Sequence, residues 1–549
     1  MPGTMPSYET LRSDFAWRLP ARWNLGVACS DLQPPGSLAL VEVGEDGSRR
    51  EWTFGELSRL SNRLANALRG RGIVRGDCVA VMLSQRVETG LAHLALYKLG
   101  AIALPLSGLF GPKAIRHRLE DSGASMLIAE PRNLEAVAAA SADGGDPELV
   151  LVDPGPVEAL DFWELLGSGS DAAVGGPTDP DDPALLIYTS GTTGPSKGAL
   201  HAQRVLLGHL PGFELSHDFF PRPGDLLWTP ADWAWIGGLM NGLMATWYHG
   251  RPVLAAVRSG RFDPEWAVDL MARNGVRNAF LPPTALKLLR RAGVDTSGLA
   301  LRSAMSGGEP LDAELLAWGR GNLGVTINEM YGQTEANYVI GNCASSWEVR
   351  PGSMGRPYPG HDVAVLDPEG LPLPVGEVGE VGVRAGDPVL FLRYWKDADA
   401  TRLKFTASRD WLLTGDLAYR DPDGYLWFKS RTDDVINSAG YRIGPAEIET
   451  CLLEHPAVAM AAAIGIPDEV RGQAVKAFVV LTDGADGDDG LVEELKQTVR
   501  ARLAAYVYPR EIEIVPDLPL TPTGKVLRSE LRRVDADTRE RAALEANSN

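Results

Sequence analysis

Apolar residues recur with the period of an α-helix near the start of the chain. Residues 52–73 carry leucines at the spacing of one helix face, at Leu57, Leu60, Leu64 and Leu68. Thr53 and Glu56 form a capping-box pair in front of them, and a glycine follows the last turn. Together these features predict one amphipathic helix.

Short apolar runs of strand length alternate with further helical segments. The runs 77–83, 102–106 and 124–130 are separated by the helical patterns 90–101 and 112–123. Strands buried on both faces read as continuous apolar runs, and the helices between them supply the covering layers. The alternation therefore predicts an α/β fold with a parallel sheet.

Two stretches depart from this alternation. Residues 131–182 are rich in Ala, Gly, Asp and Pro, which predicts a loose surface connection before the pattern resumes at Ala184. Further along, the segments 361–370, 376–385 and 423–430 alternate apolar and polar residues between Gly and Asp turns. This second pattern predicts small antiparallel strands.

A compact tail of mixed strands and helices follows the segment 431–434. A change of pattern at one short segment is typical of a domain boundary, and a chain of 549 residues is long enough for more than one domain. We therefore expect one domain over residues 1–431 and a second over residues 432–549.

Composition narrows the class of protein. Apolar residues make up 44% of the chain and charged residues 23%, as in an ordinary globular protein. The net charge of −19 argues against nucleic acid or an anionic membrane as the main partner, although a positive pocket could still take an anionic substrate. The four cysteines form no CxxC pair, so no zinc site or disulfide framework is indicated. With no signal peptide and no membrane span in the pattern, we expect a cytoplasmic protein.

One stretch, residues 185–201 (LLIYTSGTTGPSKGALH), carries a chemical signal. Small residues allow the backbone to approach an anion, their N–H and hydroxyl groups can surround phosphate oxygens, and Lys197 adds a positive charge. The spacing differs from a Walker A loop, in which the lysine directly follows a glycine. A flexible surface loop is the alternative interpretation.

Residues 188–198 (YTSGTTGPSKG) resemble the signature of the adenylate-forming superfamily, which includes acyl-CoA synthetases, adenylation domains and beetle luciferases. Further motifs follow in family order. The resemblance implies a large N-terminal domain of parallel αβ-layered sheets plus a small β-barrel-like subdomain, followed by a small mobile α+β C-terminal domain. The phosphate-binding residues that it implies are Thr189, Ser190, Gly191, Thr192, Thr193, Lys197 and Thr334.

Two later segments, 305–311 (MSGGEPL) and 328–337 (NEMYGQTEAN), resemble the next motifs of this family. The adenine-binding residues that they imply are Gly308, Glu309, Pro310 and Tyr331. The resemblance also implies that Glu335 binds Mg²⁺, which prefers oxygen ligands.

The longest match covers residues 412–449. It implies that Asp416 and Arg431 contact the ribose and that Asp433 is the hinge of the small domain. Gly440 and Arg442 match positions facing the CoA tunnel and the adenylate phosphate.

Near the C-terminus, residues 518–528 (LPLTPTGKVLR) carry Lys525. In the family this lysine reaches the carboxylate and the α-phosphate, where a cation offsets charge that develops as pyrophosphate leaves. Acylation would erase that charge, so a lysine acyltransferase and a deacylase acting on Lys525 are hypothetical partners.

The acyl group is predicted from Gly332 and from residues 228–244. Acetyl- and propionyl-CoA synthetases usually have tryptophan where this chain has Gly332, and glycine is similar to the medium-chain and aryl enzymes. The predicted lining of the pocket is Trp233, Trp235, Gly237, Met240 and Gly332. Core packing is the alternative for the tryptophans. The pocket favours medium-chain, branched or aromatic acids over acetate.

The function implied by the resemblance is that of an AMP-forming acyl-CoA synthetase of the medium-chain and acetyl-CoA synthetase branch, which uses ATP, Mg²⁺ and coenzyme A. An alternative is a stand-alone adenylation enzyme that loads an acyl or amino acid onto a carrier protein. Asp232 could hold an amino group but does not decide between the two. A nucleotide-binding protein without catalysis would be expected to lack Lys525 or Glu335. A homodimer is a further hypothesis.

Overall fold

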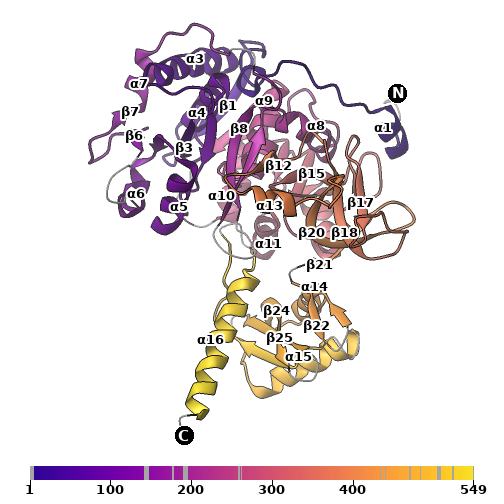
Figure 1. Ribbon diagram of the computed structural model, residues 1–549. Helices are drawn as coiled ribbons and strands as arrows, with labels where there is room; N and C mark the ends of the chain where they lie inside the picture. The colour runs from indigo at the N-terminus through magenta and orange to yellow at the C-terminus, as the bar shows by residue number, and fades with distance from the viewer. Residues whose placement is uncertain are drawn as a thin grey trace. The chain divides into compact units, whose positions relative to one another are not determined.

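The computed structural model groups the chain into two units, shown with their elements in Figure 1. The residues that it describes are 5–140, 147–175, 178–189, 196–256, 260, 262–432, 434–438, 441–468, 472–482, 484–503, 508–521 and 525–547. The first unit comprises Met1–Ser190, Ser196–Val363 and Val383–Leu412, and the second comprises Gly191–Pro195, Ala364–Gly382 and Leu413–Asn549. A large N-terminal part and a smaller C-terminal part are thus confirmed, while the domain boundary at residue 431 stays a prediction.

The predicted amphipathic helix is α3, Phe54–Gly70. The Thr53 hydroxyl accepts a hydrogen bond from the Glu56 amide, and the Glu56 carboxylate accepts one from the Thr53 amide, so the capping box is complete. All four leucines of the predicted face are buried. The helical period and its start signal are therefore both confirmed.

The first unit contains an eight-stranded sheet. Its order is β19 (Arg393–Tyr394), β9 (Lys197–Ala202), β8 (Pro183–Thr189), β4 (Ile102–Pro105), β3 (Cys78–Met82), β5 (Met126–Ala129), β6 (Glu148–Leu151) and β7 (Leu160–Asp161). The three predicted apolar runs are β3, β4 and β5, and they pair in parallel. The predicted helices α4 (Val87–Leu99) and α5 (Pro112–Ser122) follow β3 and β4. In Figure 1, α3 and α4 lie above β3 and α5 lies below it, so helices cover both faces.

The loose connection predicted for residues 131–182 is wrong. Its described part forms α6 (Leu134–Ala140) and α7 (Phe162–Ser168) as well as β6 and β7. Strand β6 pairs in parallel with β5, and its residues Val150 and Leu151 are buried. The average composition of the segment hid an apolar run of only a few residues, which is enough to extend a parallel sheet.

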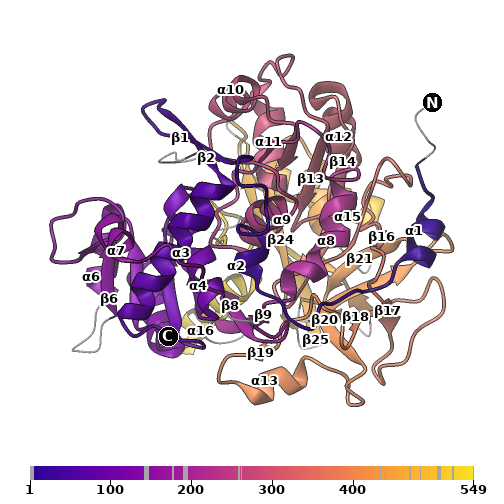
Figure 2. The same ribbon diagram turned by 90° about the horizontal axis from the view of Figure 1, so that it is seen from above.

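The first unit also contains a nine-stranded sheet. Its order is β16 (Arg356–Pro357), β15 (Ala336–Gly341), β14 (Ile327–Gln333), β13 (Ser303–Gly307), β12 (Asn278–Phe280), β10 (Leu227–Trp228), β11 (Val253–Ala256), β1 (Leu38–Val43) and β2 (Arg49–Thr53). The strands from β14 to β1 are parallel, and the outer ones are antiparallel. Helices α10 (Pro264–Asn274), α11 (Pro283–Ala292) and α12 (Ala313–Trp318) lie side by side in Figure 2 and bury an apolar cluster with this sheet.

Four strands form a separate sheet in the order β17 (Val363–Leu366), β18 (Gly379–Arg384), β20 (Trp411–Arg420) and β21 (Leu426–Arg431). The pair β20 and β21 is antiparallel, as the alternating pattern of 423–430 predicts. This pairing places Asp416 and Arg431, two residues of the motif over 412–449, opposite each other.

The C-terminal tail forms a mixed sheet in the order β23 (Tyr441–Ile443), β22 (Ile436–Ser438), β25 (Gly472–Leu481) and β24 (Val458–Asp468), with β26 (Glu511–Ile514) parallel to β25. Three helices accompany it: α14 (Pro445–Leu453), α15 (Asp489–Arg502) and α16 (Arg528–Asn547). Ile448 and Leu495 are fully buried in the apolar cluster of this part. The predicted mixture of helices and strands is confirmed.

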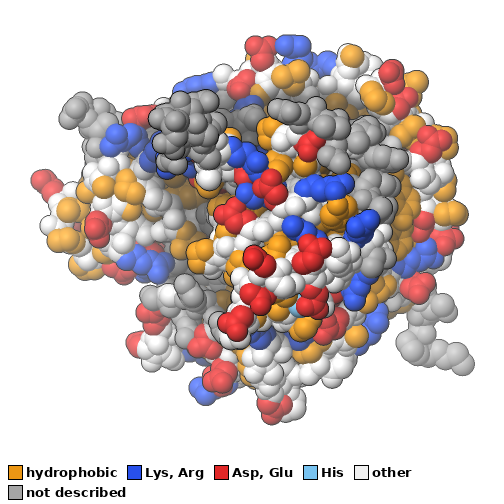
Figure 3. All heavy atoms as spheres, turned by 90° about the horizontal axis from the view of Figure 1, so that it is seen from below, with side chains coloured by type: hydrophobic (Ala, Val, Ile, Leu, Met, Phe, Trp, Pro, Cys, Tyr) orange, Lys and Arg blue, Asp and Glu red, His pale blue; other side chains and the backbone are white. Residues whose placement is uncertain are grey.

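Two features of the molecule relate to its composition: the distribution of charged side chains on the surface and the hydropathy of the helices. On the face shown in Figure 3, acidic and basic side chains are interspersed. Within the described residues, no helix is both long and apolar enough to cross a membrane.

Candidate active site

The motif that begins at Thr189 joins two antiparallel strands of the eight-stranded sheet. Thr189 at the end of β8 lies opposite Lys197 at the start of β9. Ser190, Gly191, Thr192 and Thr193 lie outside the described residues. The Lys197 ammonium is 3.9 Å from the Asp397 carboxylate and 5.6 Å from the centre of the Tyr394 ring. With 39% of its side chain exposed, Lys197 keeps a cation at the surface next to the motif.

Thr334 and Glu335 form the two-residue tip of the hairpin between β14 and β15, because Gln333 pairs with Ala336. Thr334 is half-buried and Glu335 is buried. The Tyr394 hydroxyl donates a hydrogen bond of 2.5 Å to Oε1 of Glu335, and the backbone carbonyl of Glu335 accepts one from Phe391. The carboxylate is therefore held in one orientation by a residue of β19, far away in sequence.

The segment implied for adenine begins where β13 ends. Gly308 has φ of +104°, a conformation that favours glycine, and it turns the chain away from the sheet. Glu309 accepts a contact of 3.3 Å from the Lys287 ammonium. The neighbouring strand β14 runs parallel to β13 and carries Tyr331 near its carboxyl end. Gly308 and Tyr331 are thus brought to the same edge of the sheet.

Glu329 is a residue of this site that the sequence reasoning missed. It lies in β14 with 5% of its surface exposed, and its Oε2 accepts a 2.9 Å hydrogen bond from the Leu311 amide, directly after Pro310. Burial raises the pKa of Glu329 to about 8, against the lowering effect of this hydrogen bond. Glu329 thus fixes the end of the segment implied for adenine. A carboxylate within a buried strand was the only signal that could have indicated it.

The predicted acyl-pocket residues differ in burial. Trp233 and Met240 are almost completely buried, with 1% and 0% exposure, which agrees with a packing role. Trp235 is half-buried, and its ring meets Phe110 edge-on with centroids 5.7 Å apart. Gly237 starts the π-helix η2 (Gly237–Met244), and a Cβ there would lie 3.2 Å from the Phe280 ring. Trp235 is thus the more exposed of the two tryptophans, and its place in an acyl pocket stays a prediction.

Gly332 is required by the backbone of its hairpin. A Cβ at this position would lie 2.5 Å from the Tyr338 amide nitrogen and 2.7 Å from the Asn337 Cα. Contacts this short with backbone atoms force the hairpin to shift. Its assignment to the acyl pocket stays a prediction, and substitution at Gly332 would test hairpin packing as much as pocket size.

Asp232 is already engaged by the protein. One carboxylate oxygen accepts a 2.7 Å hydrogen bond from the Ser107 hydroxyl and the other accepts a 2.9 Å bond from the Ala234 amide. Burial raises its pKa, and these bonds oppose the rise. Asp232 therefore shapes the loop before Trp233, which favours a structural role over binding of an amino group.

Two residues implied for the ribose are neighbours in the second unit. Asp416 in β20 and Arg431 in β21 are register partners, and the guanidinium donates a 3.0 Å hydrogen bond to Oδ1 of Asp416. Gly415, with φ of +78°, lets Arg431 approach the backbone at this point. The predicted Asp433, Gly440 and the side chain of Arg442 lie outside the described residues.

Lys525 is exposed, and its backbone is bonded to Thr521. The Lys525 amide donates to the Thr521 hydroxyl at 3.0 Å, and its carbonyl accepts from the Thr521 amide at 2.7 Å. Leu520 and Val526, the next residues outward, form an isolated antiparallel bridge. Residues 522–524 lie outside the described residues.

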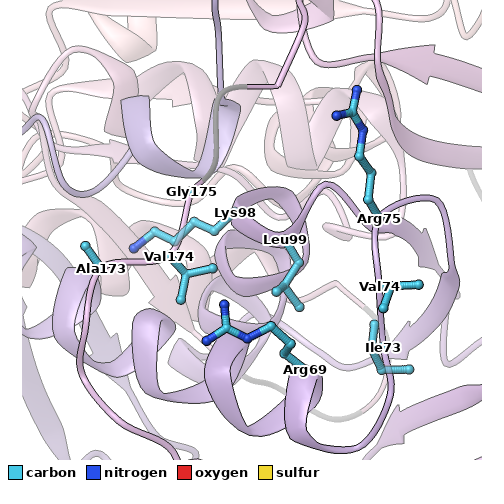
Figure 4. A pocket seen from close by; sticks show the side chains of 9 residues that line it. All are labelled: Arg69, Ile73, Val74, Arg75, Lys98, Leu99, Ala173, Val174 and Gly175. Carbon is cyan, nitrogen blue, oxygen red and sulfur yellow. The ribbon is translucent and has the colours of Figure 1, made fainter.

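A cavity of about 330 Å³ lies elsewhere in the first unit (Figure 4). Its cationic lining residues are Arg69, Arg75 and Lys98. Each of these is bonded within the protein: Arg69 to Asn66, Arg75 to Asp182 and Lys98 to Asp31. Burial lowers the pKa of Lys98, and Asp31 opposes this. The cavity contains none of the predicted site residues.

The pair of α/β sheets in the larger unit, together with the smaller mixed C-terminal part, defines the class of adenylate-forming enzymes. The model of the AMP-binding enzyme family matches residues 30–395, and the model of the AMP-binding enzyme C-terminal domain matches residues 447–525. The chain therefore belongs to the AMP-binding enzyme family, within its acyl-CoA synthetase branch, whose members are AMP-forming acid–thiol ligases.

Named relatives span nearly the whole chain. Acetyl-coenzyme A synthetase of Bacillus subtilis (strain 168) is 35% identical over 89% of this chain and 86% of its own length. Mitochondrial acyl-coenzyme A synthetase ACSM4 of Rattus norvegicus is 35% identical over 91% of this chain and 87% of its own. The structure of a benzoate CoA ligase from Burkholderia xenovorans LB400 is 27% identical, with a TM-score of 0.80 over 93% of this chain and 100% of that one. Loading of a carrier protein is not favoured by these relatives.

Proposed function

We propose that this protein activates a medium-chain, branched or aromatic carboxylic acid with ATP and transfers the acyl group to coenzyme A. One observation carries the proposal: two segments lie at the carboxyl ends of adjacent parallel strands. The segment 308–310 follows β13, whereas Tyr331 lies near the end of β14 and Glu335 lies just after that strand. Ligands of open α/β sheets bind at the carboxyl ends of their strands. The adenine and phosphate residues are therefore expected to share one edge.

In the first half-reaction, a carboxylate oxygen of the acid attacks the α-phosphorus of ATP, and pyrophosphate leaves with the electron pair of the broken P–O bond. Negative charge grows on the phosphate oxygens during this step. We assign Lys525 and Lys197, with Thr189 and Thr334, to offset that charge and to position the phosphates. Asp416 and Arg431 are assigned to the ribose, where a carboxylate can accept from two hydroxyls.

Glu335 fits a magnesium site by its chemistry. Mg²⁺ takes oxygen ligands and is usually bound through one or two carboxylates together with substrate phosphates and water. Glu335, oriented by the hydrogen bond from Tyr394 to its Oε1, is the residue that would hold the ion. When bound, the ion would neutralise phosphate charge. The role of the chain itself is to hold the carboxylate in place.

In the second half-reaction, the thiol sulfur of coenzyme A attacks the acyl carbonyl carbon, AMP leaves and the thiol proton passes to solvent. Gly440 and Arg442 are assigned to the side on which the thiol enters, and Asp433 to the hinge that changes between the two steps. These three assignments rest on the motif match alone.

The most specific part of the proposal is the class of carboxylic acid that serves as substrate. The relatives are named for acetyl and benzoate substrates, so their names leave the acid open. The half-buried Trp235 and the glycines of its segment support a large apolar acyl group. The test is ATP-dependent release of AMP across a panel of acids, with coenzyme A present and absent. A preference for acetate, or AMP release that ignores coenzyme A with every acid, would refute this assignment.

Three further proposals concern the regulation, the oligomeric state and the cellular location of the enzyme. The exposed position of Lys525 supports control through acylation by an acyltransferase and reversal by a deacylase. Mass spectrometry of the native protein, followed by enzymatic deacylation and an activity assay, tests this. The homodimer is tested by light scattering, and the cytoplasmic location by fractionation of the source cells.

A further inference from the structure

Arg528 connects two carboxylates within the second unit. Its Nη1 is 3.2 Å from Oδ2 of Asp434, and its Nε and Nη2 bond the two oxygens of Glu449 at 3.0 Å and 2.5 Å. The exposed fractions of the Arg528, Asp434 and Glu449 side chains are 21%, 11% and 12%. The guanidinium of Arg528 therefore bonds Glu449 through two nitrogens and Asp434 through the third, with most of each side chain buried.

Arg532, one turn further along α16, adds a second bond to the same aspartate. Its Nη1 lies 3.0 Å from Oδ1 of Asp434, so both oxygens of Asp434 are bonded by arginines of α16. Oε1 of Glu449 also accepts a 2.8 Å hydrogen bond from the Ala463 amide in β24. The cluster thus links the start of α16 to α14, to β24 and to the chain at Asp434.

The residues of this cluster stand close in sequence to two predicted functional residues. Asp434 directly follows Asp433, the predicted hinge, and Arg528 stands three residues after Lys525. The amide of Leu527, the residue before α16, also donates to the Pro519 carbonyl at 2.8 Å, which ties the start of α16 to the chain ahead of Lys525. The cluster is therefore connected both to the neighbourhood of Lys525 and to Asp434, next to the predicted hinge.

The arginine is charged throughout the accessible pH range. Burial alone would lower its pKa, but the carboxylates of Glu449 and Asp434 outweigh burial and raise it. Exposed ion pairs contribute little to stability, whereas loss of one partner from a desolvated cluster leaves uncompensated charge. Removal of Arg528 would therefore leave Asp434 and Glu449 with a largely buried charge that has lost a partner.

We propose that Arg528 is a positioning residue, which holds the backbone of Lys525 at a fixed place relative to Asp434 and Glu449. This inference rests on the proposed role of Lys525 in adenylation. The first half-reaction would need Lys525 in that fixed place, because the lysine must meet the reacting phosphate. The second half-reaction, in which Lys525 takes no part, would not need it.

The experiment compares the two half-reactions in four proteins: the unaltered chain, Arg528→Gln, Arg528→Lys and Arg533→Gln. The first half-reaction is measured as acid-dependent exchange of labelled pyrophosphate into ATP, and the second as thioester formation from supplied acyl-AMP and coenzyme A. Arg533 is the matched control, since it is also an arginine of α16 but pairs only along the exposed helix surface with Glu530 and Asp537 in the contacts described.

We expect Arg528→Gln to slow the exchange by about 100-fold, the cost of a misplaced catalytic group, with thioester formation unchanged. Arg528→Lys keeps the charge but cannot bond both carboxylates as a fork. Its rate of pyrophosphate exchange should therefore lie between those of Arg528→Gln and the unaltered chain. Arg533→Gln should match the unaltered chain in both assays. An equal loss in both half-reactions, or no loss in either, would overturn the proposal.

Thermal unfolding of each variant separates positioning from folding. Should Arg528→Gln fail to fold, Glu449→Gln provides the second test, because it weakens the same cluster and keeps the side-chain size. It should then show the same selective loss of exchange. Failure of the unaltered chain to exchange pyrophosphate would instead refute the proposed function, so the two failures are distinct.

Discussion

The Tyr394 hydroxyl donates a 2.5 Å hydrogen bond to Oε1 of Glu335, across 59 residues of sequence. Tyr394 is buried in β19, and its ring also lies 5.6 Å from the Lys197 ammonium. One tyrosine therefore contacts both the carboxylate assigned to Mg²⁺ and the lysine of the phosphate motif. Groups that orient a metal ligand commonly change metal affinity by 10- to about 100-fold when they are removed.

Tyr394→Phe is expected to weaken Mg²⁺ binding by about 10-fold, because Glu335 loses the bond that orients it. The measurement is a calorimetric titration of Mg²⁺ into the enzyme with a non-hydrolysable ATP analogue, alongside the Mg²⁺ dependence of pyrophosphate exchange. Tyr358→Phe is the control, since its hydroxyl donates to the Asn342 carbonyl and leaves Glu335 untouched. Equal Mg²⁺ affinity in both variants would contradict the assignment.

Lys525→Ala is expected to reduce pyrophosphate exchange by at least about 100-fold, because the cation that offsets developing charge is lost. Thioester formation from supplied acyl-AMP should stay close to that of the unaltered chain. Single-turnover assays of each half-reaction measure both quantities. A parallel loss in the two half-reactions would show that Lys525 has a different role.

Glu329→Gln is expected to change how stability depends on pH. The pKa of Glu329 is raised from 4.5 to about 8 in the folded protein, so the native state holds a proton that the unfolded state loses as pH rises between these values. Stability from this group is complete below pH 4.5 and falls as pH rises toward 8. Glutamine stays neutral, so the melting temperature of the variant relative to the unaltered chain should rise as the pH increases from 4.5 to about 8. A constant difference across this range would refute the burial argument.

Trp235→Ala is expected to shift acyl preference toward larger acids. Removal of a half-buried indole enlarges the predicted pocket, and a change of pocket size is worth about 10- to 200-fold in discrimination. The ratio of kcat/KM for a long and a short acid measures this. Trp247→Ala is the comparison, because Trp247 is a buried core tryptophan outside the predicted pocket, and its loss costs about 3–5 kcal/mol of stability without a reason to change the ratio. An unchanged ratio in Trp235→Ala would remove this residue from the pocket.

Local patterns in the sequence predicted the elements around which the site is built. The capping pair Thr53 and Glu56 and the apolar runs of β3, β4 and β5 are local signals, and the structure confirms them. Strand β6 was missed because its apolar run is short and stands within a segment of polar average composition. A parallel neighbour, β5, stabilises it, and no local pattern reports such a neighbour.

In the site, too, residues within one local motif were predicted, and residues whose contacts depend on the fold were missed. Asp416 and Arg431 were predicted from one motif, and the pairing of β20 with β21 brings them into contact. Tyr394 was missed because its partner Glu335 is distant in sequence, and an isolated tyrosine in a short strand carries no signal of its own. Glu329 was missed because its partner is a backbone amide, which no side-chain pattern reveals.

Adenylation by this chain is best tested by exchange of labelled pyrophosphate into ATP, measured on the purified protein with a broad set of carboxylic acids. We expect exchange that requires both an acid and Mg²⁺, proceeds without coenzyme A and is strongest with medium-chain, branched or aromatic acids. Absence of exchange with every acid, by a correctly folded protein, would contradict it.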